Sequence, residues 1–254
     1  MICLWFSPKP LRAEPASPSY TGETGDKLIP AQEGSDFGWG FESDFVSQYV
    51  WRGIELSEGP VLQPSLWLSY KGATFSVWGN FVLSDEANQG QLNEVDFTLG
   101  YGFEYKNFFF GPLFLFYLYP HQDIAATGEV APILGFQRGP FKLFTAQIFD
   151  MIAAPGAYFG VFGGSFEREF HEKFSLKTSA GFAWANEAFN DANFEISKFA
   201  LNLFVWNLEL HWTVKDPLYL RPHLKVSILL DEDLRGSVEH ADLISGGLAI
   251  GIDF

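Results

Sequence analysis

Alternation of apolar and polar residues marks the clearest segments of this chain as β-strands. Residues 94–105 place Val, Phe, Leu and Tyr at odd positions, and acidic, Thr or Gly residues at even positions. Residues 218–230 and 244–254 follow the same scheme. Successive side chains of a strand point to opposite faces, so each segment predicts a strand with one apolar face. The alternation by itself leaves open whether that face points inward or outward.

The links between these segments alternate between short and long. Short turn signals occur at Lys71-Gly72, Lys106-Asn107, Arg138-Gly139-Pro140, 170–173 and Lys215-Asp216-Pro217. Longer polar links occur at 52–60, 84–93, 120–128, 151–156, 186–195 and 231–240. Membrane-spanning β-barrels have an even strand number, short periplasmic turns and longer extracellular loops. The sequence therefore predicts an all-β fold, a closed antiparallel transmembrane β-barrel with both chain ends on the short-turn, periplasmic side.

About twelve strands fit this pattern. The predicted strands are 37–51, 61–70, 73–83, 94–105, 108–119, 129–138, 141–150, 157–169, 173–185, 196–214, 217–230 and 242–254. Segment 196–214 shifts its apolar residues from odd to even positions, and we interpret it as one long strand with a β-bulge near Trp206-Asn207. The alternative is a missed hairpin, which would make the strand count odd.

Composition supports this fold and removes several classes of function. Aromatic residues make up 18% of the chain, and the formal charge is −15. This acidic excess argues against a nucleic-acid partner. No stretch free of charged residues reaches the ~18–20 apolar residues of a spanning helix. The single cysteine, Cys3, excludes a disulfide framework and a cysteine-based zinc site.

The N-terminal residues differ from the rest in being rich in Pro, Gly and Ser. We expect residues 1–35 to be an export or linker segment outside the fold, and residues 36–254 to form the barrel. Met1–Phe6 is an apolar stub without the basic start and the full apolar core of a signal peptide. Either the chain starts inside a longer signal peptide, or its signal is degenerate. The predicted location is the outer membrane of a Gram-negative bacterium.

Several motifs in residues 43–105 carry a family resemblance. They are Ser43-Asp44-Phe45, Tyr49-Val50-Trp51-Arg52-Gly53-Ile54, Gly59-Pro60, Leu68-Ser69-Tyr70, Gly72, Trp78-Gly79-Asn80, and the strand from Glu94-Val95-Asp96 to Gly100-Tyr101-Gly102. Together they resemble the TorF-type family of porins. The resemblance implies an outer-membrane barrel that passes small solutes, and it supplies no catalytic residues. The chain departs from the family at its N-terminus, where a clean signal peptide is expected.

The last residue, Phe254, ends an alternating strand. An aromatic residue in this place resembles the signal that the barrel-assembly machinery of the outer membrane reads. The other expected partners are outer-membrane lipid and lipopolysaccharide, whose anionic head groups divalent cations could bridge to acidic outer loops. The sequence does not indicate an oligomeric state.

Catalytic chemistry is not predicted. The five histidines are far apart and have no metal-ligand spacing, and no G-x-S-x-G motif is present. We interpret Asp231-Glu232-Asp233 as a solvated external loop rather than a Ca²⁺ site, because it lacks the glycine and distal Glu of an EF-hand loop. Gly160, Gly163 and Gly164 are not a phosphate loop, since no helix is predicted to follow them. No cofactor or metal is expected.

Charged residues of lumen parity are the candidates for lining a pore. They are Glu42, Asp44, Arg52, Glu94, Asp96, Glu104, Lys177, Arg221, His223 and Lys225. The acids come from early strands and the bases other than Arg52 from late strands. Because the fourth strand of a twelve-strand ring lies opposite the tenth, we expect acids and bases on facing walls, where such charges select ions.

The predicted function is passive diffusion of small hydrophilic solutes or ions through a narrow, porin-like barrel. The alternatives are a closed structural or adhesin-like outer-membrane barrel, in which these charges pair as a plug, and an outer-membrane lipid-modifying enzyme. The alternative fold is a soluble, lipocalin-like barrel with its aromatic residues inside.

Overall fold

The computed structural model describes residues 37–84 and 89–254 of the chain. The predicted N-terminal segment 1–35 lies outside the described residues. The barrel begins at the first described strand and continues to the C-terminus. No helix among the described residues is long and apolar enough to cross a bilayer.

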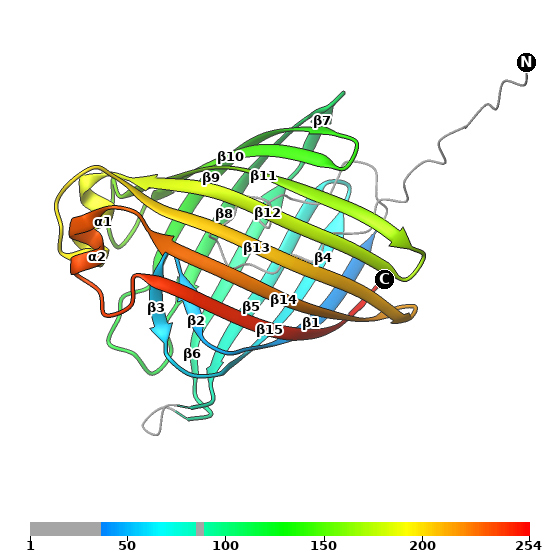
Figure 1. Cartoon of the computed structure of the whole chain (residues 1–254), viewed down its shortest axis with the longest axis horizontal. Coiled ribbons are helices and arrows are strands. Elements are labelled where there is room, and N and C mark those ends of the chain that lie inside the picture. Colours follow the sequence, from blue (N-terminus) through cyan, green and yellow to red (C-terminus); the bar gives the residue numbers. More distant parts are fainter. Residues whose placement is uncertain (1–36, 85–88) are drawn as a thin grey trace, which may run out of the picture.

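Twelve antiparallel strands form the wall of a closed barrel (Figure 1). Their bounds are β1 (Gly38–Val46), β4 (Val61–Tyr70), β5 (Ala73–Val82), β6 (Leu92–Tyr101) continued by β7 (Phe103–Tyr105), β8 (Phe108–Leu118), β9 (Thr127–Arg138), β10 (Phe141–Asp150), β11 (Tyr158–His171), β12 (Phe174–Ala185), β13 (Ala200–Lys215), β14 (Leu218–Leu229) and β15 (Asp242–Asp253). Each strand pairs with the next along the chain, and β1 pairs with β15 to close the ring. The predicted fold and strand number are confirmed.

Both described chain ends lie at the end of the barrel that carries the short turns. At the start of β1, the backbone N–H of Trp39 donates to the carbonyl of Phe254 at 3.1 Å, and their rings stack with centroids 4.5 Å apart. The turn residues Lys71 and Gly72 both have positive φ, as a tight two-residue hairpin requires. We call this the short-turn end, and the opposite end, which carries the long links, the loop end (Figure 1).

The outer face of the barrel is apolar. Large side chains that point outward and remain exposed include Phe41, Phe45, Leu66, Leu68, Phe75, Leu99, Phe114, Phe116, Leu134, Phe162, Phe182, Leu248 and Ile250. Such an apolar band faces lipid in membrane barrels. The alternative of a soluble, lipocalin-like barrel with its aromatic residues inside is therefore wrong.

The first long link does not leave the barrel as predicted. The wall strand ends at Val46, and β2 (Tyr49–Trp51) and β3 (Ile54–Ser57) form a separate two-stranded sheet. Arg52 and Gly53 at its tip have φ of 49° and 84°, which makes a tight turn. Tyr49 and Val50 are buried, because the hairpin folds into the lumen instead of extending the wall. The prediction of one strand over 37–51 and an external link over 52–60 was wrong.

Segment 196–214 contains one strand, not a hairpin, but its bulge lies elsewhere. Ala183 pairs with Leu203 and Trp184 pairs with Leu201, so Asn202 is the extra residue. Asn207 pairs regularly with both neighbouring strands. The parity changes at Asn202 because Leu203, fully buried, turns inward to the apolar interior near the loop end. The predicted bulge near Trp206-Asn207 was wrong.

Two short helices cover part of the loop end, where the sequence predicted only loops. They are α1 (Glu187–Phe194) and α2 (Glu232–Gly236). The Asn186 side chain caps α1, and the Asp231 side chain caps α2 by accepting from the N–H groups of Asp233 and Leu234. The acidic run at 231–233 thus starts a helix, and Lys198 binds the Asp231 and Asp233 carboxylates at 2.9 and 2.6 Å.

Apolar side chains fill the interior beside β8 to β13. The cluster contains Leu113, Leu115, Ile133, Phe144, Ile148, Phe159, Val161, Leu203 and Val205, together with Phe189 of α1 and Leu234 of α2. This part of the barrel is packed like the core of a globular protein. Polar inward-facing residues gather on the remaining strands and on β12 and β13 toward the short-turn end, where Ser175, Ser179, Asn207 and Glu209 are buried.

Candidate functional site

The inner faces of β1, β4, β5 and β6 form what we call the polar wall. Backbone pairing aligns its side chains in four rows across these strands. From the loop end toward the short-turn end, the rows are Asp44-Gln63-Asn80-Glu94, Glu42-Ser65-Trp78-Asp96, Gly40-Trp67-Ser76-Thr98 and Gly38-Ser69-Thr74-Gly100. All are small, polar or charged except Trp67 and Trp78. The interior therefore has a polar side and an apolar side.

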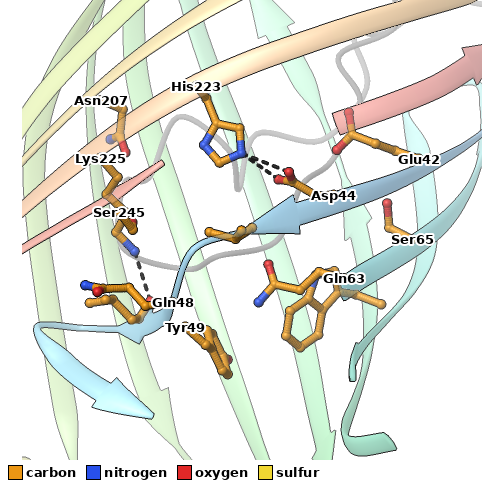
Figure 2. Close-up of a pocket in the computed structure, with 13 residues that line it drawn as sticks. Glu42, Asp44, Gln48, Tyr49, Gln63, Ser65, Asn207, His223, Lys225 and Ser245 are labelled. Carbon is orange, nitrogen blue, oxygen red and sulfur yellow. Dashed lines mark hydrogen bonds and ion pairs between the residues drawn. The ribbon is translucent and has the colours of Figure 1, made fainter. Parts of the chain in front are cut away.

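A ladder of side-chain amides connects the strands of the polar wall. Gln63 donates to Asn80 at 3.0 Å, and Asn80 donates to Asn93 at 2.8 Å. Asn93 lines a cavity of about 840 Å³ at the loop end. Gln63 lines a second cavity of about 30 Å³ inside the barrel (Figure 2). The ladder thus joins an outer cavity to an inner one with hydrogen-bonding groups.

The β1 flank of the wall, Glu42 and Asp44, is paired with basic side chains. Arg221 of β14 binds the Glu42 carboxylate through Nη2 at 2.5 Å and Nε at 3.1 Å, and binds Glu209 at 2.9 Å. His223 of β14 forms a hydrogen bond with Asp44 at 2.9 Å (Figure 2). These groups are nearly inaccessible to solvent. The ion pairs compensate the cost of burying the acids.

The β6 flank of the wall, Glu94 and Asp96, has no such pairing. Both acids are at most 5% exposed. Within the described residues neither acid is in an ion pair, and Glu94 has a hydrogen bond with the hydroxyl of Tyr49 on the hairpin. One oxygen of Asp96, Oδ1, is buried without a hydrogen-bond partner. The two flanks therefore differ in charge although they share rows.

The hairpin of β2 and β3 crosses the lumen between opposite walls. On one side, Lys225 of β14 donates to the Val50 carbonyl at 2.9 Å (Figure 2). On the other side, Arg52 binds Glu129 of β9 with two bonds of 2.8 and 2.6 Å. The Arg52 guanidinium also lies 4.4 Å from the Trp51 ring centroid and close to the rings of Phe159 and Phe189. The hairpin is thus anchored on both sides of the barrel.

Most of the predicted pore-lining residues point into the barrel. Glu42, Asp44, Glu94, Asp96, Arg221, His223 and Lys225 lie on the inner face, and Lys177 pairs in register with Glu209. Arg52 lies inside as well, but on the hairpin rather than on the wall. Glu104 is exposed on β7 near the short-turn end and does not join the enclosed groups.

The expected arrangement of facing acidic and basic walls is wrong. Arg221 and His223 come late in the sequence but lie beside β1, because closure of the ring places β14 one strand away from it. Their side chains bind acids of nearby strands, namely Glu42 and Asp44 of β1 and Glu209 of β13. Strand β13, opposite β6, presents Glu209, which Arg221 already binds.

Sequence reasoning missed Glu129 and the hydroxyl groups of the wall. Glu129 shares the inner parity of Ala131 and Ile133, so a lone acid at the start of an apolar inner face was the available signal. Ser76 and Thr98 gave none, because single hydroxyl residues are common on any strand.

Comparison with known proteins supports the fold. No protein-family model and no curated protein sequence matches the chain. Among solved structures, the NanC porin is similar, with 12% identity, a TM-score of 0.53, and coverage of 85% of this chain and 98% of that chain. An outer-membrane channel from Pseudomonas putida F1 has 10% identity, a TM-score of 0.49 and coverage of 86% and 94%. The KdgM porin has 8% identity, a TM-score of 0.49 and coverage of 85% and 98%.

The likeness to NanC, together with the closed ring and the apolar outer face, shows the fold of an outer-membrane porin-type barrel. This fold and its apolar band belong in the bacterial outer membrane. At such low identity the likeness concerns the fold alone. The solute, if one passes, has to be argued from the interior.

Proposed function

We propose that this protein is a narrow, porin-like channel for passive diffusion of small hydrophilic solutes or ions. The observation that carries the proposal is the polar wall, which presents hydrogen-bonding groups from the outer cavity to the inner cavity through the Gln63–Asn80–Asn93 ladder. A polar, hydrogen-bonding lining is what a hydrated solute needs in a low-dielectric barrel. The apolar cluster around Phe144, Phe159 and Leu203 offers no such groups.

The hairpin sets the width of the proposed path. It occupies the lumen near the loop end and is held by Arg52 and Lys225. A twelve-stranded barrel is wider than the eight-stranded barrels that side chains fill, and narrower than the porins of sixteen to eighteen strands. With the hairpin inside, we expect a small conductance and passage limited to ions and small solutes.

Single-channel recording in planar bilayers tests the proposal. Purified barrel should give discrete conductance steps, and barrel with Asn80→Leu, which interrupts the amide ladder, should give smaller steps or none. A variant of an outward-facing residue, Leu66→Val, is the matched control and should conduct as the unchanged protein does. Absence of steps from correctly folded protein would contradict the channel.

A closed structural or adhesin-like barrel is the second candidate. The observation that favours it is the pairing of Arg221 and Arg52 with buried acids, since salt bridges with the hairpin among them can act as a plug. This candidate predicts no conductance from folded protein, so the same recording separates the two. An enzyme is not favoured, because the similar structures are porins and channels.

We extend the proposal to family and partners. Membership of the TorF-type family is supported by the Tyr49–Ile54 motif, which builds the lumen hairpin. We propose that lipopolysaccharide contacts the acidic outer loops, and that the barrel-assembly machinery recognises the last strand ending at Phe254, whose ring stacks on Trp39. Deleting Phe254 should lower the amount of assembled barrel in cells, measured by heat-modifiable gel mobility.

A further inference from the structure

Three buried oxygen atoms lie at neighbouring positions of β5 and β6, at the β6 flank, without a hydrogen-bond partner. They are Ser76 Oγ, Asp96 Oδ1 and Thr98 Oγ1. Ser76 and Thr98 share one row of the polar wall, and Asp96 is two residues from Thr98 on the same face of β6. A buried polar group left unpaired costs about 1–3 kcal/mol, and such groups are rare in native proteins. Three in one patch indicate that a polar species binds there.

The charge of the patch restricts what that species can be. Asp96 and the adjacent Glu94 bring two carboxylates, and the described residues offer neither of them an ion pair. Arg52 acts on Asp96 electrostatically, but both of its amino nitrogens bind Glu129. The strand on the far side of β6 is β8, where Asp96 is in register with Tyr117, an uncharged side chain that donates to Glu129. The patch is therefore acidic, and a cation is the species that its charge favours.

The ligand atoms restrict the cation further. All three unpartnered atoms are oxygens, one from a carboxylate and two from hydroxyl groups. Hard cations such as Ca²⁺ bind carboxylate and other oxygen ligands and keep part of their water. Paired residues on neighbouring strands are about 4.5–5.5 Å apart at Cβ, which leaves space for water between side chain and ion.

We propose that the β6 flank binds a hard metal cation of the Ca²⁺ class through the Asp96 carboxylate and the Ser76 and Thr98 hydroxyls, with Glu94 as the second charge. The site is reached along the same rows as the inner cavity, since Ser65 and Trp78, which line that cavity, share a row with Asp96. The binding does not depend on conduction. Only the consequence that the channel prefers cations rests on the proposed function.

Terbium luminescence tests the binding directly. Tb³⁺ substitutes for Ca²⁺ and emits when a nearby tryptophan is excited, and Trp78 is in register with Asp96. Detergent-purified barrel, freed of metal with chelator, should give tryptophan-sensitised terbium emission that Ca²⁺ displaces. The double variant Asp96→Asn with Glu94→Gln should weaken terbium binding by roughly tenfold or more.

The matched control removes the same number of acids at the loop end, as Asp123→Asn with Asp191→Asn of α1, and should bind terbium like the unchanged protein. Heat-modifiable gel mobility verifies that each variant is folded. Equal terbium binding in the double variant and the control would overturn the proposal. So would a large loss of stability in Asp96→Asn without metal, because it would mean that Asp96 has a protein partner.

Thermal unfolding gives a second measurement of the same site. Ca²⁺ should raise the unfolding temperature of the unchanged barrel and of the control, but not that of the double variant, because binding to the folded state alone stabilises it. A Ca²⁺ effect that the double variant retains would overturn the proposal. Terbium binding without conductance would refute the proposed channel but support the cation site. Conductance without terbium binding would support the channel but refute the cation site.

Discussion

The two flanks of the polar wall carry two acids each in the same two rows, yet their surroundings differ. Glu42 and Asp44 of the β1 flank lie within reach of Arg221 and His223, because closure of the ring brings β14 next but one to β1. Strands β5 and β8 beside the β6 flank offer amide, hydroxyl and apolar side chains instead. The comparison teaches that ring closure, which the linear sequence hides, decides which lumen charges are neutralised.

The largest expected effect on stability comes from a substitution that breaks the ion pairs at the β1 flank. Arg221→Met leaves Glu42 and Glu209 buried without their guanidinium and should lower the free energy of unfolding by about 3–5 kcal/mol. Asp96→Asn at the β6 flank should cost nothing or stabilise the metal-free barrel. Denaturant unfolding in detergent, followed by tryptophan fluorescence, measures both, and an equal loss in the two variants would refute the difference between the flanks.

The second largest expected effect comes from a substitution of Arg52, which anchors the hairpin. Arg52→Gln leaves Glu129 without its two charge-assisted bonds and removes the stacking on Trp51, so the tip should detach at a cost of about 3 kcal/mol. The lumen then holds one more uncompensated acid near the β6 flank. Single-channel recording should show larger steps and a stronger preference for cations. Unchanged steps would mean that the hairpin does not limit the path.

The amide ladder between the flanks should give a smaller effect. Asn80→Leu leaves the amides of Gln63 and Asn93 without a partner, with an expected cost of about 1–3 kcal/mol. Asn80 is in register with Glu94 but lies one row toward the loop end from Asp96, so terbium binding at Asp96 should persist. Urea unfolding and terbium titration of the same preparation measure the two quantities, and loss of both together would mean that the ladder shapes the cation site.

The smallest expected effect is pH dependence at the edge of the hairpin. A hydrogen bond to Glu55 of β3 raises the pKa of the exposed His240 from its usual value, and Glu239 and Glu58 add to this. Because the pKa of His240 is raised in the folded state, its contact with Glu55 contributes its full stabilisation below about pH 6.5, the pKa of an unperturbed histidine. This stabilisation is lost as the pH rises through the raised pKa. After correction for the intrinsic exchange rate, the β3 amides should therefore be less protected against hydrogen exchange at pH 8 than at pH 6.

A His240→Gln variant is the control for this measurement, because Gln does not titrate. Its β3 amides should exchange with the same protection at both pH values, after correction for the intrinsic rate. If the variant keeps the pH dependence of the unchanged protein, another group is responsible and the contact between His240 and Glu55 does not hold the hairpin.

The wall of the barrel was predictable because strand alternation is a local property. The strands around 61–70 and 141–150 begin and end as predicted, since two-residue turns such as Lys71-Gly72 fix both neighbours. The even strand number and the short-turn end at which the first strand begins and the last strand ends followed from the alternation of link lengths. These features need no knowledge of which strands meet across the barrel.

The interior was less predictable because it depends on contacts between distant residues. Residues 47–57 show a strand pattern, but their apolar side chains serve the lumen, so the sequence alone did not distinguish a longer wall strand from an inward hairpin. The bulge at Asn202 follows from burial of Leu203 beneath the helices, which parity cannot place to the residue. Glu42 and Arg221 are 179 residues apart, and only the closed ring brings them together.

Reversal potentials across a salt gradient test most directly the claim that the β6 flank holds the uncompensated charge of the path. The unchanged barrel should prefer cations. Asp96→Asn should move the reversal potential markedly toward zero, whereas Asp44→Asn, which removes an acid that is hydrogen-bonded to His223 and lies 3.6 Å from Arg221, should change it little. An unchanged potential in Asp96→Asn, or equal shifts in the two variants, would contradict the account.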